Sequence, residues 1–323
     1  MFRARANPAG LLVSKPKLLK RSYCSDYHPI PRIRLLGPTL WSLTACSTIY
    51  LGCAAYEVYQ DAQRAKAKES RWTHGKPFQT FEELEHFRDR EATGTTLYRP
   101  SRSTSERPEL SDPQRLTMGI MGLTAGTHLA SSIMPAMMSH LVHTPRLSSN
   151  YTLLTSVFGH AGLMHLGLNL YGMFYFIPSA AYSPTFKGSN AHLTAFYLSA
   201  GILSSLAQHV TAVWPRRTAG MSSLGASGAL FALLGIVGIS SPNTQVGMIF
   251  LPGSLPIGEA MACIALFDAI GILVRYPYLR LGHGAHLGGL AFGAAYVKYG
   301  GDKNIWRPGR RIVFKAMRSL GLL

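Results

Sequence analysis

A serine flanked by small residues stands at the start of a short and very apolar stretch of the chain. Gly225-Ala226-Ser227-Gly228 leads into an apolar run that ends at Ile239. A helix from Ser227 to Ile239 would cover only about two-thirds of a ~30 Å hydrocarbon core. In a membrane, this helix would hold a serine hydroxyl, the nucleophile of acyl-transfer chemistry, below the surface.

A second apolar stretch carries two histidines and an asparagine. His160 comes first, and His165 and Asn169 are four residues apart, which places these two on one face of a helix. Ionisable groups inside membrane spans are costly and are functional candidates for that reason. Neutral His and Asn side chains donate hydrogen bonds to the oxyanion of an acyl-transfer transition state. We predict that His165 and Asn169 stabilise such an oxyanion.

A third stretch combines a histidine with small residues at helical spacing. His286 is followed by Gly289 and Gly293, a pattern that lets another helix backbone approach closely. Gly225, Gly228 and Gly235 would provide the matching small surface on the serine helix. The two helices can therefore bring the serine within hydrogen-bonding reach of His286.

These residues supply the parts of a serine hydrolase without a metal or another cofactor. His286 would accept the proton of Ser227 and later protonate the leaving amine. Soluble serine hydrolases orient the histidine with a carboxylate, and the nearest candidate here is Asp268. Its spacing gives no reason to place it behind His286, so we predict a Ser-His dyad and a structural role for Asp268. His283, one turn before His286, is the alternative base.

The composition indicates a membrane protein. Of 323 residues, 47% are hydrophobic and only 15% charged, and the mean hydropathy is +0.11; soluble domains have about 25% charged residues. The net charge of +17 is concentrated at the ends and in linkers, which argues against a nucleic-acid stripe. No acidic residue stands between Asp112 and Glu259, and the four cysteines show no disulfide or zinc spacing.

The chain divides into five segments by charge and hydropathy. Residues 1–34 are basic and acid-poor, as in a mitochondrial transit peptide with cleavage near residue 24, and a basic juxtamembrane tail is the alternative. Residues 35–56 form one transmembrane helix, 57–115 a polar linker with a short helix near 78–90, 116–300 a six-helix domain, and 301–323 a basic tail typical of a membrane-surface helix. The six spans are predicted at 116–134, 153–177, 193–213, 227–239, 257–274 and 286–299.

The ordered motifs resemble the rhomboid family of intramembrane serine proteases. Gly-x-Ser-Gly, His-x-x-x-Asn upstream and Ala-His-Leu-Gly-Gly downstream carry the resemblance, which covers roughly residues 115–300. It implies an all-α membrane protein in which one extra transmembrane helix precedes a six-helix core (1+6). It also implies that Ser227 is the nucleophile, His286 the base, His165 and Asn169 the oxyanion donors, and His160 a supporting residue.

The extra first span and the transit-like start are similar to the mitochondrial presenilin-associated rhomboid-like branch. This similarity implies a multi-pass protein of the mitochondrial inner membrane that cleaves transmembrane clients in the lipid bilayer. In that branch the clients include a dynamin-like fusion GTPase, a cytochrome c peroxidase precursor and a mitophagy kinase. One departure is the loop 140–151, which lacks the Trp-Arg pair of many bacterial members.

Two other classes of function fit parts of the pattern. A transporter or channel could use His160, His165, His283 and His286 as ligands, although carboxylates are nearly absent from the spans. A catalytically inactive, client-binding rhomboid-like scaffold would not need Ser227 or His286, and this sequence contains both. For the protease, the loops 240–255 and 275–282 are candidate gates.

Overall fold

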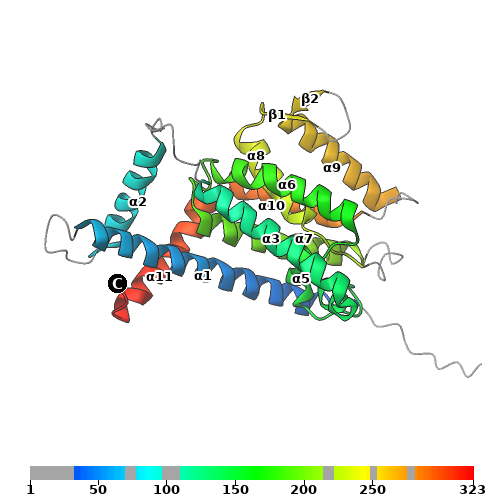
Figure 1. The fold of residues 1–323 in the computed structure, drawn as a ribbon, viewed down its shortest axis with the longest axis horizontal. Coiled ribbons are helices and arrows are strands. Elements are labelled where there is room, and N and C mark those ends of the chain that lie inside the picture. The colour runs from blue at the N-terminus through cyan, green and yellow to red at the C-terminus, as the bar shows by residue number, and fades with distance from the viewer. Residues whose placement is uncertain (1–32, 70–77, 97–109, 214–221, 248–252, 275–280) are drawn as a thin grey trace, which may run out of the picture. The chain divides into compact units, whose positions relative to one another are not determined.

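The computed structural model describes residues 33–69, 78–96, 110–213, 222–247, 253–274 and 281–323. Most of these residues are helical, and Arg32–Leu323 packs as one unit (Figure 1). The expected cleavage site near residue 24 lies outside the described residues.

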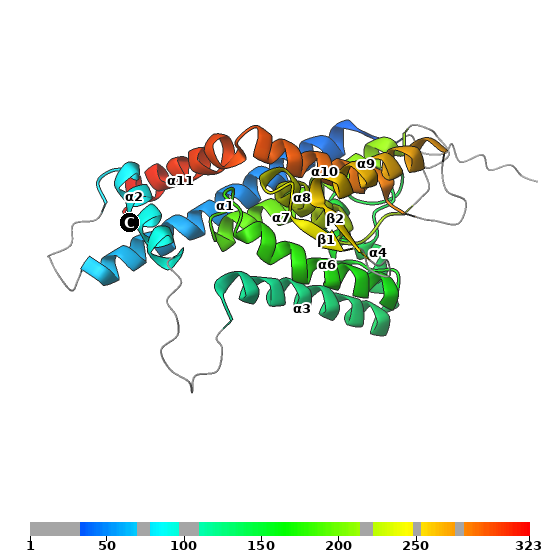
Figure 2. The ribbon, with the colours of Figure 1, turned by 90° about the horizontal axis from the view of Figure 1, so that it is seen from above.

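Six long helices occupy the region predicted as the core, because each apolar run is bounded by polar, glycine or proline residues that end it. Their bounds are α3 Asp112–Ile133, α6 Leu163–Ala181, α7 Asn190–Thr211, α8 Ser227–Ser240, α9 Ile257–Val274 and α10 His283–Lys298. Helix α10 packs against α8 and α7, α6 packs against α8, and α3 lies along α6 (Figure 2). Helix α8 is the most enclosed, as its apolar sequence requires.

The predicted span 153–177 is wrong at its start, because the structure has no continuous helix there and α6 begins only at Leu163. Two short helices, α4 Met138–Leu141 and α5 Thr152–Thr155, precede the break. At Gly159 a side chain would place its Cβ 2.4 Å from the carbonyl oxygen of Leu141, so the loop and α4 approach as only glycine allows. His160 therefore lies before α6 and not on it.

The structure is mostly helical, as the all-α prediction requires, and contains one short hairpin in its described part. Strand β1, Gln245–Gly247, pairs antiparallel with β2, Ser254–Pro256, with Val246 opposite Leu255. This hairpin belongs to the loop 240–255 that was predicted as a gate. Residues 248–252 of that loop and 275–280 of the second predicted gate lie outside the described residues.

The extra helix is longer than the predicted span. Helix α1 runs over 34 residues, Leu36–Glu69, and packs along α7. The linker helix α2, Phe81–Thr96, and the tail helix α11, Arg307–Ser319, lie at the far end of α1 (Figure 1). An apolar cluster of Val58, Leu84 and their neighbours joins these three helices.

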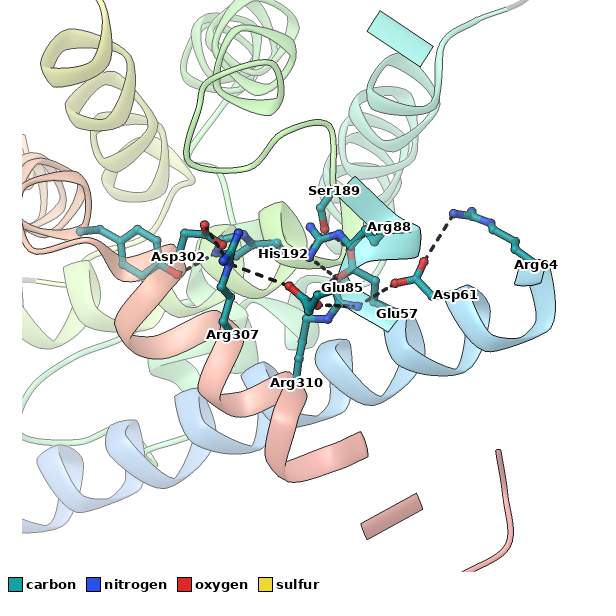
Figure 3. A network of polar contacts seen from close by, with 11 residues as sticks. Glu57, Asp61, Arg64, Glu85, Arg88, Ser189, His192, Asp302, Arg307 and Arg310 are labelled. Atoms are coloured by element: carbon teal, nitrogen blue, oxygen red, sulfur yellow. Dashed lines mark hydrogen bonds and ion pairs between the residues drawn. The ribbon is translucent and has the colours of Figure 1, made fainter. Parts of the chain in front are cut away.

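A buried ion-pair network holds the tail helix, which was predicted to lie on a membrane surface. Arg310 of α11 is fully buried and lies 2.8 Å from Glu57, 2.7 Å from Asp61 and 3.2 Å from Glu85 (Figure 3). Burial raises the pKa of Asp61 to about 6, against the opposing effect of Arg310. One face of α11 is thus an intramolecular contact, because a buried guanidinium needs carboxylates around it.

Among the described helices, length and composition alone support membrane crossing for one. Of the helices in the described part of the chain, one, α9, is long and apolar enough to span a bilayer, with a mean hydropathy of 2.0 over 18 residues, and α8 is apolar but shorter. Glycine, serine and threonine dilute the apolar half of α1. The seven-span arrangement therefore stays a prediction.

Candidate active site

Helices α8 and α10 are in contact through backbone atoms. A Cβ added at Gly289 would lie 2.1 Å from the carbonyl oxygen of Gly228, and one added at Gly293 would lie 1.9 Å from that of Ala232. Both distances are far below a van der Waals contact, so only glycine fits at these two positions. The small-residue stripe predicted from the sequence is the surface on which the two helices meet.

This packing places Ser227 beside His286. The Oγ atom of Ser227 lies 2.9 Å from Nε2 of His286, a hydrogen-bond distance. Phe231, one turn further along α8, stacks on the imidazole ring with centroids 4.2 Å apart and an angle of 12° between the planes. The serine is half-buried and the histidine buried, so the pair is ordered and shielded from bulk water.

Asp268 completes the contacts of the imidazole ring on the other side. Its Oδ1 atom lies 3.3 Å from Nδ1 of His286 and 2.6 Å from Nδ1 of His283. The carboxylate is 1% exposed, in the middle of α9. Because Nε2 of His286 faces the serine hydroxyl, the Nδ1–H donates to Asp268. This contact was not predicted from the sequence, although an acidic residue within an apolar run, such as Asp268, indicates a functional partner.

The turn before Ser227 depends on glycine. Gly225 has φ of +120°, which side chains rarely adopt, and its N–H donates to the carbonyl oxygen of Ser156 at 2.8 Å. A Cβ here would also lie 2.8 Å from Cε1 and Nε2 of His165. The absence of a side chain therefore brings the His165 ring against the segment that carries the serine.

His165 and Asn169 are placed differently with respect to the serine. The N–H of Ala161 donates to Nδ1 of His165 at 3.4 Å, which leaves the proton on Nε2, the atom next to Gly225. Asn169 is buried and donates from Nδ2 to the carbonyl oxygen of His165 at 2.8 Å, which leaves one N–H of the amide. The structure thus presents a His165 donor toward the turn before the serine, and Asn169 is bonded to the backbone of His165.

His160 lies behind His165. Its ring centroid is 5.0 Å from that of His165, and its Nδ1 donates to the carbonyl oxygen of Phe158 at 3.3 Å. Its Nε2 is buried and has no hydrogen-bond partner among the described residues. His160 therefore lies against His165, one of the two oxyanion candidates.

Gln208 is a further contributor that the sequence did not reveal. Its Oε1 atom accepts a hydrogen bond from the N–H of Ala285 at 3.1 Å and so caps the start of α10, next to His286. Among the residues that the structure describes, no group of three or more His, Cys, Asp or Glu side chains is arranged to hold a metal ion. Ser227, His286 and Asp268 are, by type and order of contact, side chains that can carry out acyl transfer.

Comparison with known proteins identifies the domain. The family described as the Rhomboid domain matches residues 148–303, which include all the helices that carry the site. Residues 148–303 are a rhomboid domain. The rhomboid family is known for intramembrane serine proteases.

Three curated relatives support this identification. The chain is 32% identical over 203 residues to the presenilin-associated rhomboid-like proteins, mitochondrial, of Mus musculus and Homo sapiens, covering 61% of this chain and 52% and 51% of theirs. It is 29% identical over 165 residues to Rhomboid protein 1, mitochondrial, of Saccharomyces cerevisiae, covering 49% of this chain and 44% of the relative. The chain spans about half the length of the curated relatives it matches.

Proposed function

We propose that this protein is a serine endopeptidase that hydrolyses peptide bonds in or near the transmembrane segments of client proteins. The observation that carries the proposal is the 2.9 Å contact between Ser227 Oγ and His286 Nε2 on two helices of a rhomboid domain. The relatives are named mitochondrial, which supports a mitochondrial membrane as the site of action.

The geometry supports a two-step acyl transfer. Ser227 Oγ attacks the scissile carbonyl carbon while His286 Nε2 takes the hydroxyl proton, and the resulting tetrahedral intermediate collapses as the imidazolium protonates the leaving amine. The product of this step is an acyl-serine ester. A water molecule that gives its proton to His286 then hydrolyses the ester and restores the serine.

Neighbouring groups serve the charges that develop in these steps. The Nε2–H of His165 and the N–H at the start of α8 are donors for the oxyanion, and the positive end of the α8 dipole adds to them. Asp268 holds His286 in the tautomer that leaves Nε2 free to accept, and stabilises the imidazolium. In this role Asp268 is a positioning residue of a Ser-His pair.

The outer surfaces of the helices support a membrane setting. Large apolar side chains point away from the protein on α3, α6 and α9, with exposed fractions of 62% for Leu129, 82% for Met164 and 64% for Leu273. Extended apolar surface of this kind marks contact with lipid or with another protein. The apolar helix α8 is too short to span a bilayer, so the serine would be recessed.

The start of α1 lies on the same side as the active site. The carbonyl oxygen of Arg34 accepts a hydrogen bond from Nε2 of His209 at 2.8 Å, and the neighbouring Gln208 caps the start of α10. In a 1+6 arrangement, the site would therefore open toward the compartment that holds the residues before α1. Protease accessibility of a tag placed before α1 tests this orientation.

The transporter alternative is less well supported by the contacts of the histidines. His283 and His286 both bond to Asp268, and His286 also faces the serine. Imidazoles fixed in this way are suited to proton transfer with Ser227. A catalytically inactive scaffold would not need the contacts of His286 with Ser227 and Asp268, so their presence favours the protease.

Cleavage of a single-span client in proteoliposomes tests the proposal. The purified chain is reconstituted with a tagged model protein whose transmembrane helix contains glycine near one surface, since helix-weakening residues expose the scissile carbonyl. Cleavage should be lost in Ser227→Ala and retained in Ser179→Ala, whose hydroxyl bonds only within α6. Equal cleavage by both variants would refute the assignment of the nucleophile.

A further inference from the structure

Two buried histidines outside the active site form a continuous hydrogen-bonded chain. Nε2 of His209 lies 2.8 Å from the carbonyl oxygen of Arg34, and Nδ1 of His209 lies 2.9 Å from Nε2 of His143. Nδ1 of His143 lies 2.7 Å from Oγ1 of Thr152. Both histidines are at most 2% exposed, and their ring centroids are 5.2 Å apart.

The groups at the two ends of this hydrogen-bonded series determine which ring nitrogens carry protons. A carbonyl oxygen only accepts, so Nε2 of His209 carries a proton and, in the neutral ring, Nδ1 accepts. Nε2 of His143 must then donate, and its Nδ1 accepts from the hydroxyl of Thr152. One added proton can be accommodated on His143, because Thr152 can turn its hydroxyl to the carbonyl oxygen of Ser149 at 2.7 Å. A second proton would set two N–H groups against each other.

The backbone of His143 holds the segment that leads to Ser227. His143 and Ser223 exchange two backbone hydrogen bonds, of 2.9 and 2.8 Å, and Oγ1 of Thr144 lies 2.9 Å from Oγ of Ser222. Three residues separate Ser223 from Ser227. Displacement of His143 would therefore move the strand-like segment whose end positions the nucleophile.

The other histidine is adjacent to the element that carries the base. Gln208, which caps α10 at Ala285, directly precedes His209 on α7. The end of α7 is thus bonded to the carbonyl group of Arg34 before α1, to the start of α10 and, through His143, to the segment before Ser227. A rigid joint at this point would fix the distance between the two reacting groups.

We propose that His143 and His209 are positioning residues that, in single neutral tautomers, hold the Ser227 segment against the end of α7 and the start of α1. This inference rests on the proposed function. It adds two residues that do not touch the reacting atoms and lie outside the motifs that carry the chemistry.

The charges around the pair favour the neutral state. The ionisable side chains nearest in sequence to His143 are His140, Arg146 and Tyr151, the one beside the α1 contact is Arg34, and none of them is a carboxylate. Helix α7 and the described part of the segment before Ser227 belong to the stretch of sequence without acidic residues, and the first acid of α1 is Glu57. Burial and the neighbouring His209 ring lower the pKa of His143 to about 4.

Substitutions at His209 separate positioning from general stability. His209→Leu removes both hydrogen bonds, whereas His209→Gln keeps one donor and one acceptor and should rescue. His192→Leu is the matched control, because His192 is a fully buried histidine on the same helix that bonds elsewhere, to Tyr296 at 2.7 Å. The variants are compared by the rate at which a fluorophosphonate labels Ser227 and by amide hydrogen exchange of residues 222–226.

For His209→Leu we expect labelling at least about tenfold slower, since small misplacements of reacting groups are costly, together with faster exchange of residues 222–226. His209→Gln should label within about threefold of the native chain. His192→Leu should melt at a lower temperature but keep the native labelling rate and the native exchange of this segment. Native rates for His209→Leu, or an equal loss for His192→Leu, would overturn the proposal.

The pH dependence provides a second readout. The folded-state pKa of His143 is depressed, so its contribution to stability is present above pH 6.5 and is lost as the pH falls toward 4. Because Asp61 acts in the opposite direction over the same window, the readout is a comparison: toward pH 4 the melting temperature of the native chain should fall more steeply, or rise less, than that of His143→Gln. An unchanged slope would contradict the neutral assignment. If the native chain is not labelled at all, the proposed function fails, and hydrogen exchange still decides the positioning role.

Discussion

Asp268 Oδ1 lies 3.3 Å from Nδ1 of His286, on the side of the imidazole away from Ser227. The carboxylate belongs to α9 and the histidine to α10, so the contact depends on how these two helices cross. It gives the ring a fixed orientation and a counter-charge for the imidazolium. The pair predicted from the sequence is therefore supported by a third, buried group.

Removing the charge of Asp268 should slow catalysis while the fold is retained. Asp268→Asn keeps the size of the side chain but no longer stabilises the imidazolium, so we expect a loss of about 100-fold or more in the rate of client cleavage. His283→Gln, which changes the other partner of Asp268, is the control and should cost much less. Native rates for Asp268→Asn would show that serine and histidine suffice.

A methyl group at the contact of α8 and α10 should separate the catalytic residues. Gly289→Ala and Gly293→Ala each drive a Cβ into a carbonyl group, and overpacking of this kind costs about 1–3 kcal/mol or more. The melting temperature in detergent and the cleavage rate should both fall. Gly122→Ala, at a position in α3 with nothing within 4 Å of the new Cβ, should lower neither.

Removal of Arg310 should destabilise the joint between α1, α2 and α11. Arg310→Met leaves three carboxylates close together without the guanidinium that neutralises them, and breaking a buried ion pair costs about 3–5 kcal/mol. Denaturant or thermal unfolding followed by circular dichroism measures the loss. Arg311→Met, at an exposed pair with Glu82, should change stability by less than about 1 kcal/mol.

Asp61 should make stability depend on pH between about 4 and 6. Its folded-state pKa is raised from 3.8 to about 6, so its contribution is complete below the ordinary pKa and is lost as the pH rises through 6. Across this window the difference is about 3 kcal/mol. Unfolding measured at pH 4 to 7 should show that the native chain loses stability relative to Asp61→Asn as the pH rises; parallel profiles would contradict the shift.

The helices of the core could be predicted because each is an apolar run with clear ends. Helix α9 was predicted to the residue, and α7, α8 and α10 within three residues. The break before α6 was not, because Gly159 is compatible with a helix in sequence and its close approach to Leu141 appears only in the fold. Local pattern thus determines the elements, and tertiary contact determines where they stop.

The candidate site was predictable where one motif lies on one helix. The serine, its glycines and the downstream histidine form such motifs, and the structure brings them together. The contact of Asp268 with His286 and the role of Gln208 were not predicted, because their partners lie on other helices at a register that no spacing in the sequence encodes. The same holds for Arg310, which nothing distinguishes from the other basic residues of the tail.

The most direct test of Ser227 as the nucleophile is to locate, by mass spectrometry, the residue of the native chain that reacts with a fluorophosphonate probe. We expect the adduct on Ser227, no adduct in Ser227→Ala, and labelling at least about 100-fold slower in His286→Ala. An adduct on another residue, or labelling that survives both substitutions, would contradict the assignment of Ser227 as a nucleophile activated by His286.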